Sequence, residues 1–403
     1  MKLINFLKRK NSEYKIGIIE EFILMIAACS LCLLVGFSMS NKKVEKTVEY
    51  DKHLTKFIDN YNYIVDNYYK KVDKKQLIDD AIAGMMKTLD DPYSVYLNDK
   101  ETKSINIALN GEYKGLGMVI AKNESGDMVV AGIFKDSPAS KAEIKEGDII
   151  KKIDDKEVSE METSEFSDYV IKSKKNEFKI VVNRDGEDIE ITVNKSNVEI
   201  DSVSSKTIEK DNKKIGYIYV SMFAANTDKQ FKKKLSELEK DGIDSLIIDV
   251  RDDSGGYLTT VDSILKMFMT KKQVIYQLNK GKVTIKEYGI SKANKKYKIV
   301  LLGNENSASA SELLISGIRE NYNNSVFIGK KTYGKGTAQE MVSLDIDSKY
   351  KITTKKWLTP KGNWINDTEG IIPDIEIDTD VVSFGDIEKD DKQLNKAVEE
   401  IIK

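Results

Sequence analysis

Histidine and cysteine are almost absent from this chain of 403 residues. The only histidine is His53, and the two cysteines, Cys29 and Cys32, lie together in one apolar run. A catalytic triad with histidine could therefore use only His53, a cysteine nucleophile has no candidate outside the apolar run, and a zinc site lacks its usual ligands. A hydrolase built from this sequence needs another base. No spacing of Asp, Glu and Gly resembles a calcium loop, so we expect no metal and no cofactor.

An excess of charge of one sign is also missing. The chain has 64 Lys and Arg against 66 Asp and Glu, which leaves a formal net charge of -2. Without a basic field to attract phosphates, nucleic acid is not an expected partner. The hydrophobic content of 40% and the length are sufficient for two or three folded units, each with its own core.

One long apolar run stands near the amino terminus. Phe22 to Met39 form 18 positions without a charge, about the shortest length that crosses a membrane as a helix. Basic residues are denser before the run than after it, which predicts that the amino terminus stays in the cytoplasm. We therefore predict a cytoplasmic segment at 1–21, a single-pass anchor in the plasma membrane at 22–39, and an extracytoplasmic remainder.

A cleaved signal peptide is the alternative interpretation of the same run. Ser38 and Ser40 are small residues at a plausible cleavage site, although the run is long for a signal peptide core. With either interpretation the exported part contains no cysteine, so its domains must be held by their hydrophobic cores without disulfides.

The rest of the chain changes texture three times. Apolar residues recur near the helical period in 51–104, and short β-type runs separated by turns fill 105–198. Apolar strands alternate with helical stretches in 199–380, and an amphipathic helix is expected in 381–403. The predicted fold class is α/β (α+β) and multidomain, with a mixed sheet and helices in the core region and a smaller domain inserted before it.

A glycine loop opens the second of these regions. In Gly115-Leu116-Gly117-Met118, two glycines flank an apolar residue, so successive backbone N–H groups can converge on an anion such as a free carboxylate. Ser137-Pro138-Ala139 and the run from Ile144 to Ile150 follow. Together these motifs resemble a PDZ domain, which implies that Gly115, Leu116, Gly117 and Met118 bind the carboxyl terminus of a peptide.

Serines gather where a strand meets a helix. The run from Asn304 to Glu312 directly follows an apolar strand that ends at Leu302. A serine in this position can present its hydroxyl beside the unpaired N–H groups of a helix amino terminus, which stabilise a developing oxyanion. A simple helix cap is the alternative interpretation, because serine is a favoured cap residue.

A lysine flanked by glycines offers the missing base. Gly334-Lys335-Gly336 superficially resembles a phosphate loop, but the Ser or Thr that would follow the lysine is replaced by glycine. If burial lowers the pKa of Lys335 from its usual value near ~10.4, the neutral amine can accept a proton from serine. Gln339 could orient the amine without adding charge.

Together these segments resemble the carboxyl-terminal processing (tail-specific) serine peptidases, over almost the whole chain after the apolar run. The resemblance implies that Ser309 is the nucleophile and Lys335 the base, with Gln339 as its supporting partner; Ser307 and Ser311 remain alternative nucleophiles. It also implies an oxyanion hole formed by the N–H groups of Gly255 and Ala310. Two departures are Asp253-Ser254 where the family usually has Asn-Pro, and Tyr93 where histidine is common.

The function implied by this resemblance is that of a membrane-anchored, extracytoplasmic endopeptidase with a Ser/Lys dyad. It would cleave proteins near their carboxyl termini after the PDZ domain has bound the terminal carboxylate, so its partners are protein or peptide substrates and the membrane at 22–39. The helical ends at 51–88 and 390–402 resemble segments that form dimers in relatives. Two alternatives are a catalytically silent adaptor that binds carboxyl-terminal tails, and an esterase or amidase of the cell envelope.

Overall fold

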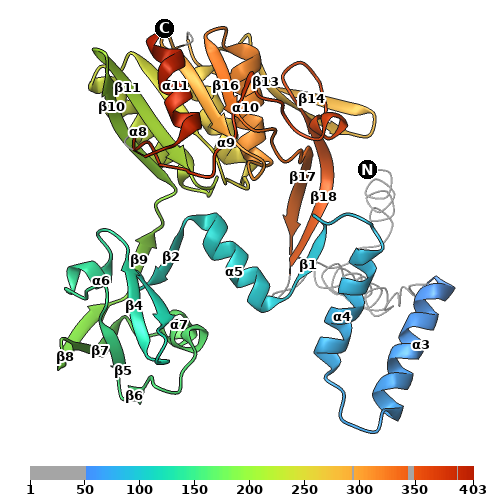
Figure 1. Cartoon of the computed structure of the whole chain (residues 1–403). Coiled ribbons are helices and arrows are strands. Elements are labelled where there is room, and N and C mark those ends of the chain that lie inside the picture. The colour runs from blue at the N-terminus through green and yellow to red at the C-terminus, as the bar shows by residue number, and fades with distance from the viewer. Residues whose placement is uncertain (1–50, 293–294, 344–348, 388) are drawn as a thin grey trace, which may run out of the picture. The chain divides into compact units, whose positions relative to one another are not determined.

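The computed structural model describes residues 51–292, 295–343, 349–387 and 389–403 (Figure 1). The chain divides into two compact units, Met1–Leu77 and Ile78–Lys403. Within the described ranges no helix is both long enough and apolar enough to cross a membrane. The anchor predicted at 22–39 lies outside the described residues, so it stays a prediction.

The first unit contributes one complete described helix, α3 (Lys52–Asn67). Asp51 caps it by accepting a hydrogen bond from the backbone N–H of His53 at 2.7 Å. None of the residues of α3 is buried, and its apolar side chains Leu54, Phe57 and Ile64 are at least 40% exposed. The next helix, α4 (Lys74–Lys87), spans the boundary between the units.

A small mixed domain, here called the middle domain, occupies 112–199. Its six-stranded sheet has the order β3-β4-β5-β7-β8, and β6 pairs with β5. Along these strands, successive side chains point alternately into the domain and outward. The apolar side chains on the inside pack with Phe166 and Val170 of α7. A separate pair, β2 and β9, closes the domain where the chain enters and leaves it. The elements are β2 (Glu112–Gly115), β3 (Met118–Lys122), β4 (Met128–Ile133), α6 (Pro138–Lys141), β5 (Ile149–Ile153), β6 (Lys156–Glu157), α7 (Thr163–Lys172), β7 (Glu177–Arg184), β8 (Glu187–Asn194) and β9 (Ser196–Glu199).

A six-stranded sheet of order β10-β11-β12-β15-β16-β19 forms the centre of the following region. Its strands are parallel except for the antiparallel pair β10 and β11. They are β10 (Val203–Lys210), β11 (Lys213–Val220), β12 (Ser245–Asp249), β15 (Lys298–Gly303), β16 (Ser325–Gly329) and β19 (Ile375–Glu376). The central strand β12 is buried along its whole length, as expected for a strand covered on both faces.

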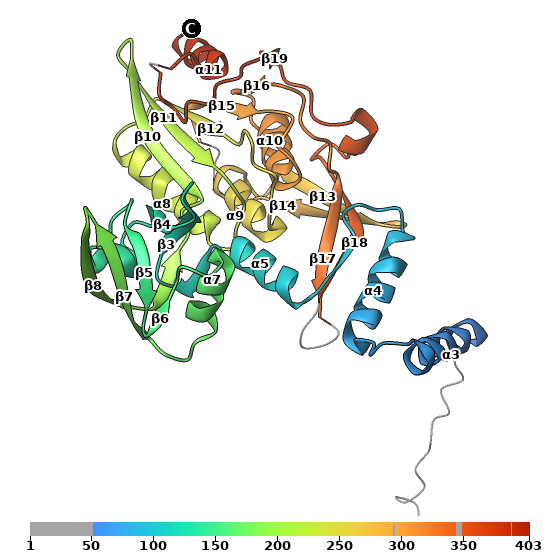
Figure 2. The same ribbon diagram turned by 60° about the horizontal axis from the view of Figure 1, so that its bottom comes forward.

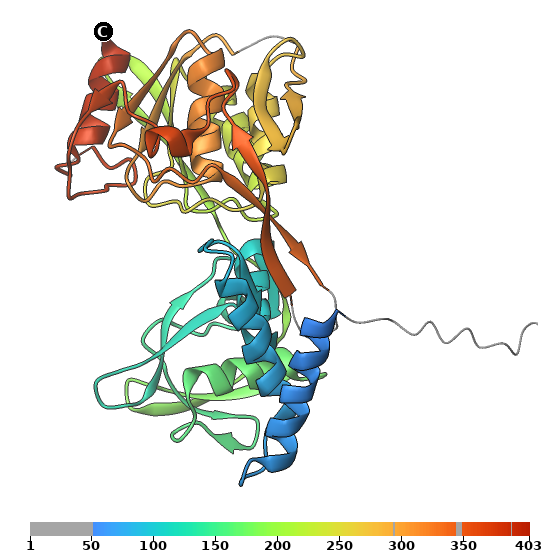
Figure 3. The ribbon, with the colours of Figure 1, turned by 90° about the vertical axis from the view of Figure 1, so that its right-hand side faces the viewer.

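Different helices cover the two faces of this sheet (Figures 1 and 3). Leu246 and Ile248 of β12 belong to the core shared with α8 (Thr227–Lys240), α9 (Leu258–Phe268) and α10 (Ala310–Asn321). Ile247 lies between them in the sequence and belongs to a second core on the opposite face, which it shares with α11 (Lys392–Ile402). Because successive side chains of a strand point to opposite faces, one apolar run supplies both cores.

A second sheet lies beside the first and has the order β1-β18-β13-β14. The hairpin of β17 and β18, visible in Figure 2, adds β17 as its fifth strand. This sheet brings residues 95–97 against residues 349–351, more than two hundred positions later in the chain. Its strands are β1 (Val95–Leu97), β13 (Val274–Lys280), β14 (Val283–Tyr288), β17 (Thr337–Val342) and β18 (Lys349–Leu358); α5 (Asp99–Asn110) and the 3-10 helix η1 (Ile365–Thr368) complete the described elements.

Candidate active site

Ser309 stands at the amino terminus of α10, after β15 has ended at Gly303. Its backbone has φ 56° and ψ -109°, an unfavourable conformation for a residue with a side chain. Such strain persists only where the surroundings hold the residue in place, and it is common at functional sites. The backbone N–H of Ser309 donates to Oε2 of Glu312 at 2.7 Å, which helps to hold the turn.

The neighbouring serines are placed differently. Ser307 is fully buried, and its hydroxyl donates to the backbone oxygen of Val250 at 2.7 Å. Ser311 is also fully buried and donates to the backbone oxygen of Asp253 at 2.8 Å. Both hydroxyls therefore connect the serine run to the loop after β12, whereas Ser309 is only partly buried and lines a cavity.

Lys335 lies in the loop between β16 and β17, half-buried in the same cavity. Its Nζ is 4.5 Å from the centre of the Tyr93 ring. Burial, together with repulsion from Lys351, lowers the pKa of Lys335 to about 8, although the carboxylates of Glu312 and Asp91 act in the opposite direction. An amine with this pKa is largely neutral at mildly alkaline pH and can then accept a proton.

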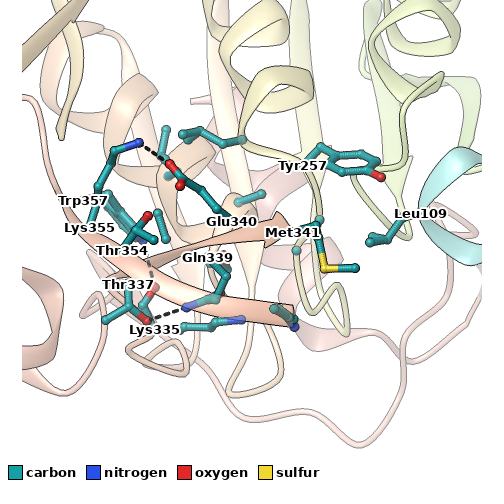
Figure 4. A pocket seen from close by; sticks show the side chains of 18 of the residues that line it. Leu109, Tyr257, Lys335, Thr337, Gln339, Glu340, Met341, Thr354, Lys355 and Trp357 are labelled. Carbon is teal, nitrogen blue, oxygen red and sulfur yellow. Dashed lines mark hydrogen bonds and ion pairs between the residues drawn. The ribbon is translucent and has the colours of Figure 1, made fainter. Parts of the chain in front are cut away.

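One cavity of about 430 Å³ brings the predicted site residues together (Figure 4). Ser309, Ala310, Lys335, Gln339 and Gly255 all line it, although they come from three separate stretches of the chain. No hydrogen bond joins the Ser309 hydroxyl to Nζ of Lys335 in this structure, which is common before a substrate is bound. The remaining wall is mainly apolar and includes Leu109, Met222, Leu258, Leu278, Leu313, Met341 and Trp357.

Gln339 is held by two threonines rather than by the lysine. Its Nε2 donates to Oγ1 of Thr337 at 3.0 Å (Figure 4). It also donates to Oγ1 of Thr353 at 3.0 Å. Thr353 lies on β18, paired with Gln339 across the hairpin. With both amide hydrogens directed to hydroxyls, the orientation of the side chain is set, and its oxygen remains the acceptor that could face an ammonium or hydroxyl group.

The loop Asp252 to Gly256 forms the wall of the cavity beside Ser309. A Cβ on Gly255 would lie 2.7 Å from the backbone oxygen of Ala308 and 2.9 Å from Cβ of Ser309, so only glycine fits there. The Gly255 N–H donates to Oδ1 of Asp253 at 2.8 Å. For Gly255 to stabilise an oxyanion as predicted, this hydrogen bond has to be released or shared.

The N–H of Gly256 is a further candidate donor to an oxyanion, and the sequence interpretation did not name it. Phe223 donates its N–H to the oxygen of Gly255 at 3.0 Å and accepts the N–H of Tyr257 at 2.7 Å. In this parallel bridge the N–H of Gly256 points away from Phe223, and Gly256 lines the cavity. The first N–H of α10, that of Ala310, is the other predicted donor.

Glu312 is a site residue whose role the sequence analysis missed. Its carboxylate is fully buried and accepts four hydrogen bonds, from the N–H groups of Ser309, Gly334 and Lys335 and from the hydroxyl of Thr332. Burial raises the pKa of Glu312, while these four donors favour the ionised form. The spacing Ser-x-x-Glu is a capping-box signal, but it gives no hint of the contact with the lysine loop.

A buried ion cluster anchors the start of the loop Asp252 to Gly256. The guanidinium of Arg251 is fully buried between Asp249, at the end of β12, and Asp391, at the cap of α11. Its Nη1 also donates to Oε1 of Gln393 at 3.2 Å. Because a buried guanidinium needs all its partners, the carboxyl-terminal helix and the loop with Gly255 hold one another in place.

The glycine loop of the middle domain forms a second, smaller cavity of about 60 Å³. Gly115, Leu116, Gly117 and Met118 line it together with Phe166, Val170 and Ile171 of α7. The oxygen of Gly117 accepts from the N–H of Phe134 and the hydroxyl of Ser137, so the loop is attached to the domain core.

Within the described residues no group of three or more His, Cys, Asp or Glu could hold a metal ion.

Three descriptions of known protein families match parts of this chain. Residues 214–377 match the description Peptidase family S41, residues 115–194 match the PDZ domain, and residues 35–102 match the amino-terminal domain of the activating protease CtpB. The carboxy-terminal processing protease CtpB of Bacillus subtilis is 34% identical over 332 residues, which cover 82% of this chain and 68% of CtpB. The chain belongs to peptidase family S41. It is a serine-type peptidase with a PDZ domain, which confirms the predicted family and enzyme class.

Other relatives agree with this assignment. A protein of Staphylococcus aureus described as a CtpA-like serine protease is 33% identical over 358 residues, which cover 88% of this chain and 71% of the relative. A solved structure described as an S41 protease from Bacteroides fragilis has a TM-score of 0.50 at 15% identity and covers 83% of this chain and 91% of that one, which supports the fold alone. The predicted multidomain α/β architecture, with a PDZ domain beside a peptidase domain, is thereby confirmed.

Proposed function

We propose that this S41 peptidase is a membrane-anchored, extracytoplasmic endopeptidase that cleaves proteins near their carboxyl termini, with Ser309 as nucleophile and Lys335 as general base. The observation that carries the proposal is that Ser309 and Lys335 line one cavity in which the pKa of Lys335 falls to about 8. A serine presented at a helix amino terminus and a partly neutral lysine are the two parts that a Ser/Lys mechanism requires.

The reaction follows from these groups. Lys335 accepts the proton of the Ser309 hydroxyl as Oγ attacks the carbonyl carbon of the substrate. The N–H of Ala310 and an N–H of the loop with Gly255 and Gly256 donate to the oxyanion of the tetrahedral intermediate. When the intermediate collapses, the C–N bond breaks and Lys335 returns the proton to the leaving amine. Water, activated by the amine of Lys335, then hydrolyses the ester on Ser309.

Recognition of the substrate is assigned to the middle domain. Its cavity combines the glycine loop 115–118 with the apolar residues of α7, which suits a free carboxylate next to an apolar side chain. The apolar wall of the catalytic cavity likewise favours cleavage beside apolar residues. The protein is placed outside the cytoplasm on the basis of the apolar run 22–39, and a homodimer through the helical ends 51–88 and 390–402 is part of the same proposal.

The proposal is tested by incubating the purified protein and its Ser309→Ala variant with an unstructured protein that has a free carboxyl terminus. We expect new termini, identified by mass spectrometry, only with the wild type. A tail-binding adaptor would give equal, negligible cleavage in both. Parallel ester and peptide substrates separate a peptidase from an esterase or amidase that uses the same dyad, and rapid ester turnover without peptide cleavage would contradict the proposal.

A further inference from the structure

Lys351 is a second lysine in the catalytic cavity, and no part of the mechanism above uses it. It lies on β18, opposite Met341 of β17 and Val95 of β1, and it lines the cavity together with Ser309 and Lys335. It is half-buried, and burial lowers its pKa, while attraction to Asp91 acts in the opposite direction. Asp91 and Lys335 are thus its charged neighbours.

Lys351 differs from the third lysine of the cavity, Lys355, which lies four residues later on the same strand. Nζ of Lys355 forms an ion pair with Glu340 at 2.6 Å, so its charge is compensated. Within the described residues, the side chain of Lys351 forms no hydrogen bond or ion pair, and Asp91 attracts its charge only from a distance. An ammonium without a directly bound counter-ion in a partly closed cavity acts strongly on other titratable groups there, because little water screens it.

The charge of Lys351 affects the protonation of Lys335. The charged form of Lys335 is favoured by the carboxylates of Glu312 and Asp91 and by the face of the Tyr93 ring, 4.5 Å from Nζ. Burial and the positive charge of Lys351 oppose these three. Placing a second cationic group beside a lysine is an established way to keep a lysine amine neutral and reactive.

We propose that Lys351 is a positioning residue that acts through Lys335: its ammonium, held by β18 in the shared cavity, disfavours a second ammonium and leaves the Lys335 amine able to accept the Ser309 proton. The inference rests on the proposed Ser/Lys mechanism and adds to it. It assigns the role of setting the pH range of activity to a residue outside the proposed Ser/Lys dyad.

The kinetic test compares the pH dependence of kcat/KM for wild type, Lys351→Met, Lys351→Arg and Lys356→Met, with a short quenched peptide as substrate. Lys351→Met removes the charge at nearly constant volume, so the pKa of Lys335 rises and the rising limb moves to higher pH. Each pH unit of displacement lowers the rate about tenfold on the acidic side and leaves the alkaline plateau unchanged. Lys351→Arg keeps the limb in place, and so does Lys356→Met, at an exposed residue of β18 that does not line the cavity.

A second measurement does not depend on turnover. In the Ser309→Ala background, the rate at which an amine-reactive reagent labels Lys335 is followed against pH by mass spectrometry. The labelling midpoint should rise in Ser309→Ala/Lys351→Met and stay in place in Ser309→Ala/Lys356→Met. This readout tests Lys351 even if Ser309 is not the nucleophile, and the Ser309→Ala comparison in the cleavage assay tests the mechanism separately.

Three results would overturn the inference. The first is an unchanged labelling midpoint in a folded Lys351→Met protein, and the second is an equal displacement by Lys356→Met. The third is a loss of activity by the same factor at every pH with the limb in place, which would identify Lys351 as a ligand for an anionic group of the substrate. Thermal unfolding of each variant establishes that it is folded.

Discussion

The backbone N–H groups of Ser309 and Lys335 both donate to one carboxylate oxygen, Oε2 of Glu312, at 2.7 and 2.9 Å. The proposed nucleophile and base are therefore positioned by one buried atom, although 26 positions separate them in the sequence. Because the side chain that holds them belongs to α10, the geometry of the dyad depends on how the loop after β16 packs against this helix.

Glu312→Gln should strongly reduce activity. All four partners of the carboxylate are donors, so an amide, which carries two hydrogens of its own, cannot replace it. Hydrogen bonds to a charged group contribute about 1.5–3 kcal/mol each, so we expect kcat/KM to fall at least about tenfold and the unfolding temperature to decrease. Glu305→Gln, at an exposed residue that pairs with Lys330, is the matched control and should change neither quantity appreciably. Wild-type kinetics in Glu312→Gln would show that Glu312 does not position the dyad.

Lys335→Arg should be nearly as inactive as Lys335→Ala. A guanidinium remains protonated at accessible pH and cannot accept the Ser309 proton, and the loss of a general base costs about 10²–10⁴ in rate. If the lysine served only as a cation in its loop, arginine would be tolerated. Peptide cleavage by the two variants, with thermal unfolding as the control for folding, separates these roles, and near-normal turnover by Lys335→Arg would rule out the mechanism.

The rising limb of the pH profile should belong to Lys335. Since its pKa is lowered to about 8, activity should increase as pH rises through that region, because protonated Lys335 cannot act as base below it. His53 lies in α3, in the first unit, and its backbone N–H donates to Asp51, the residue that caps this helix. His53→Ala should therefore keep both the limb and nearly full activity, and loss of cleavage in the folded variant would argue for a histidine base.

Capture of carboxyl-terminal tails is best tested at Ile171. Leu116 is 4% exposed and part of the core of the middle domain, so a charge there would unfold the domain as well as alter the groove. Ile171 lines the same cavity but is 40% exposed. Ile171→Asp should weaken binding of peptides with free apolar carboxyl termini by at least about tenfold, while a short tail-independent peptide is still cleaved.

The control for this prediction is Asp168→Asn, on the same helix but outside the cavity. It should bind peptides as the wild type does. Peptides with amidated termini supply the second comparison, since they lack the carboxylate that the glycine loop is proposed to bind. Equal affinity for free and amidated peptides would show that the loop does not recognise the carboxylate.

Local patterns in the sequence were sufficient to predict the order of the domains and five of the residues that line the cavity of Ser309. The strand that ends before the serine run, the glycines around Lys335 and the glycine loop at 115–118 are short-range signals, since each reflects what the backbone can do within a few residues. Scarcity was equally informative, because a chain with one histidine and no cysteine beyond the apolar run leaves few possible bases. The membrane anchor and the dimer stay predictions.

Only the tertiary structure decided which distant residues support this site. The contact of Glu312 with the lysine loop, the ion cluster of Arg251 with Asp391, and the position of Lys351 beside Lys335 join residues that are 16 to 140 positions apart. No local pattern encodes such contacts, because they arise when strands pair and helices pack, and burial then determines how strongly the charges interact. The sequence by itself indicated Ser309 and Lys335 as the proposed dyad, and the fold decided what surrounds them and hence the pKa of Lys335.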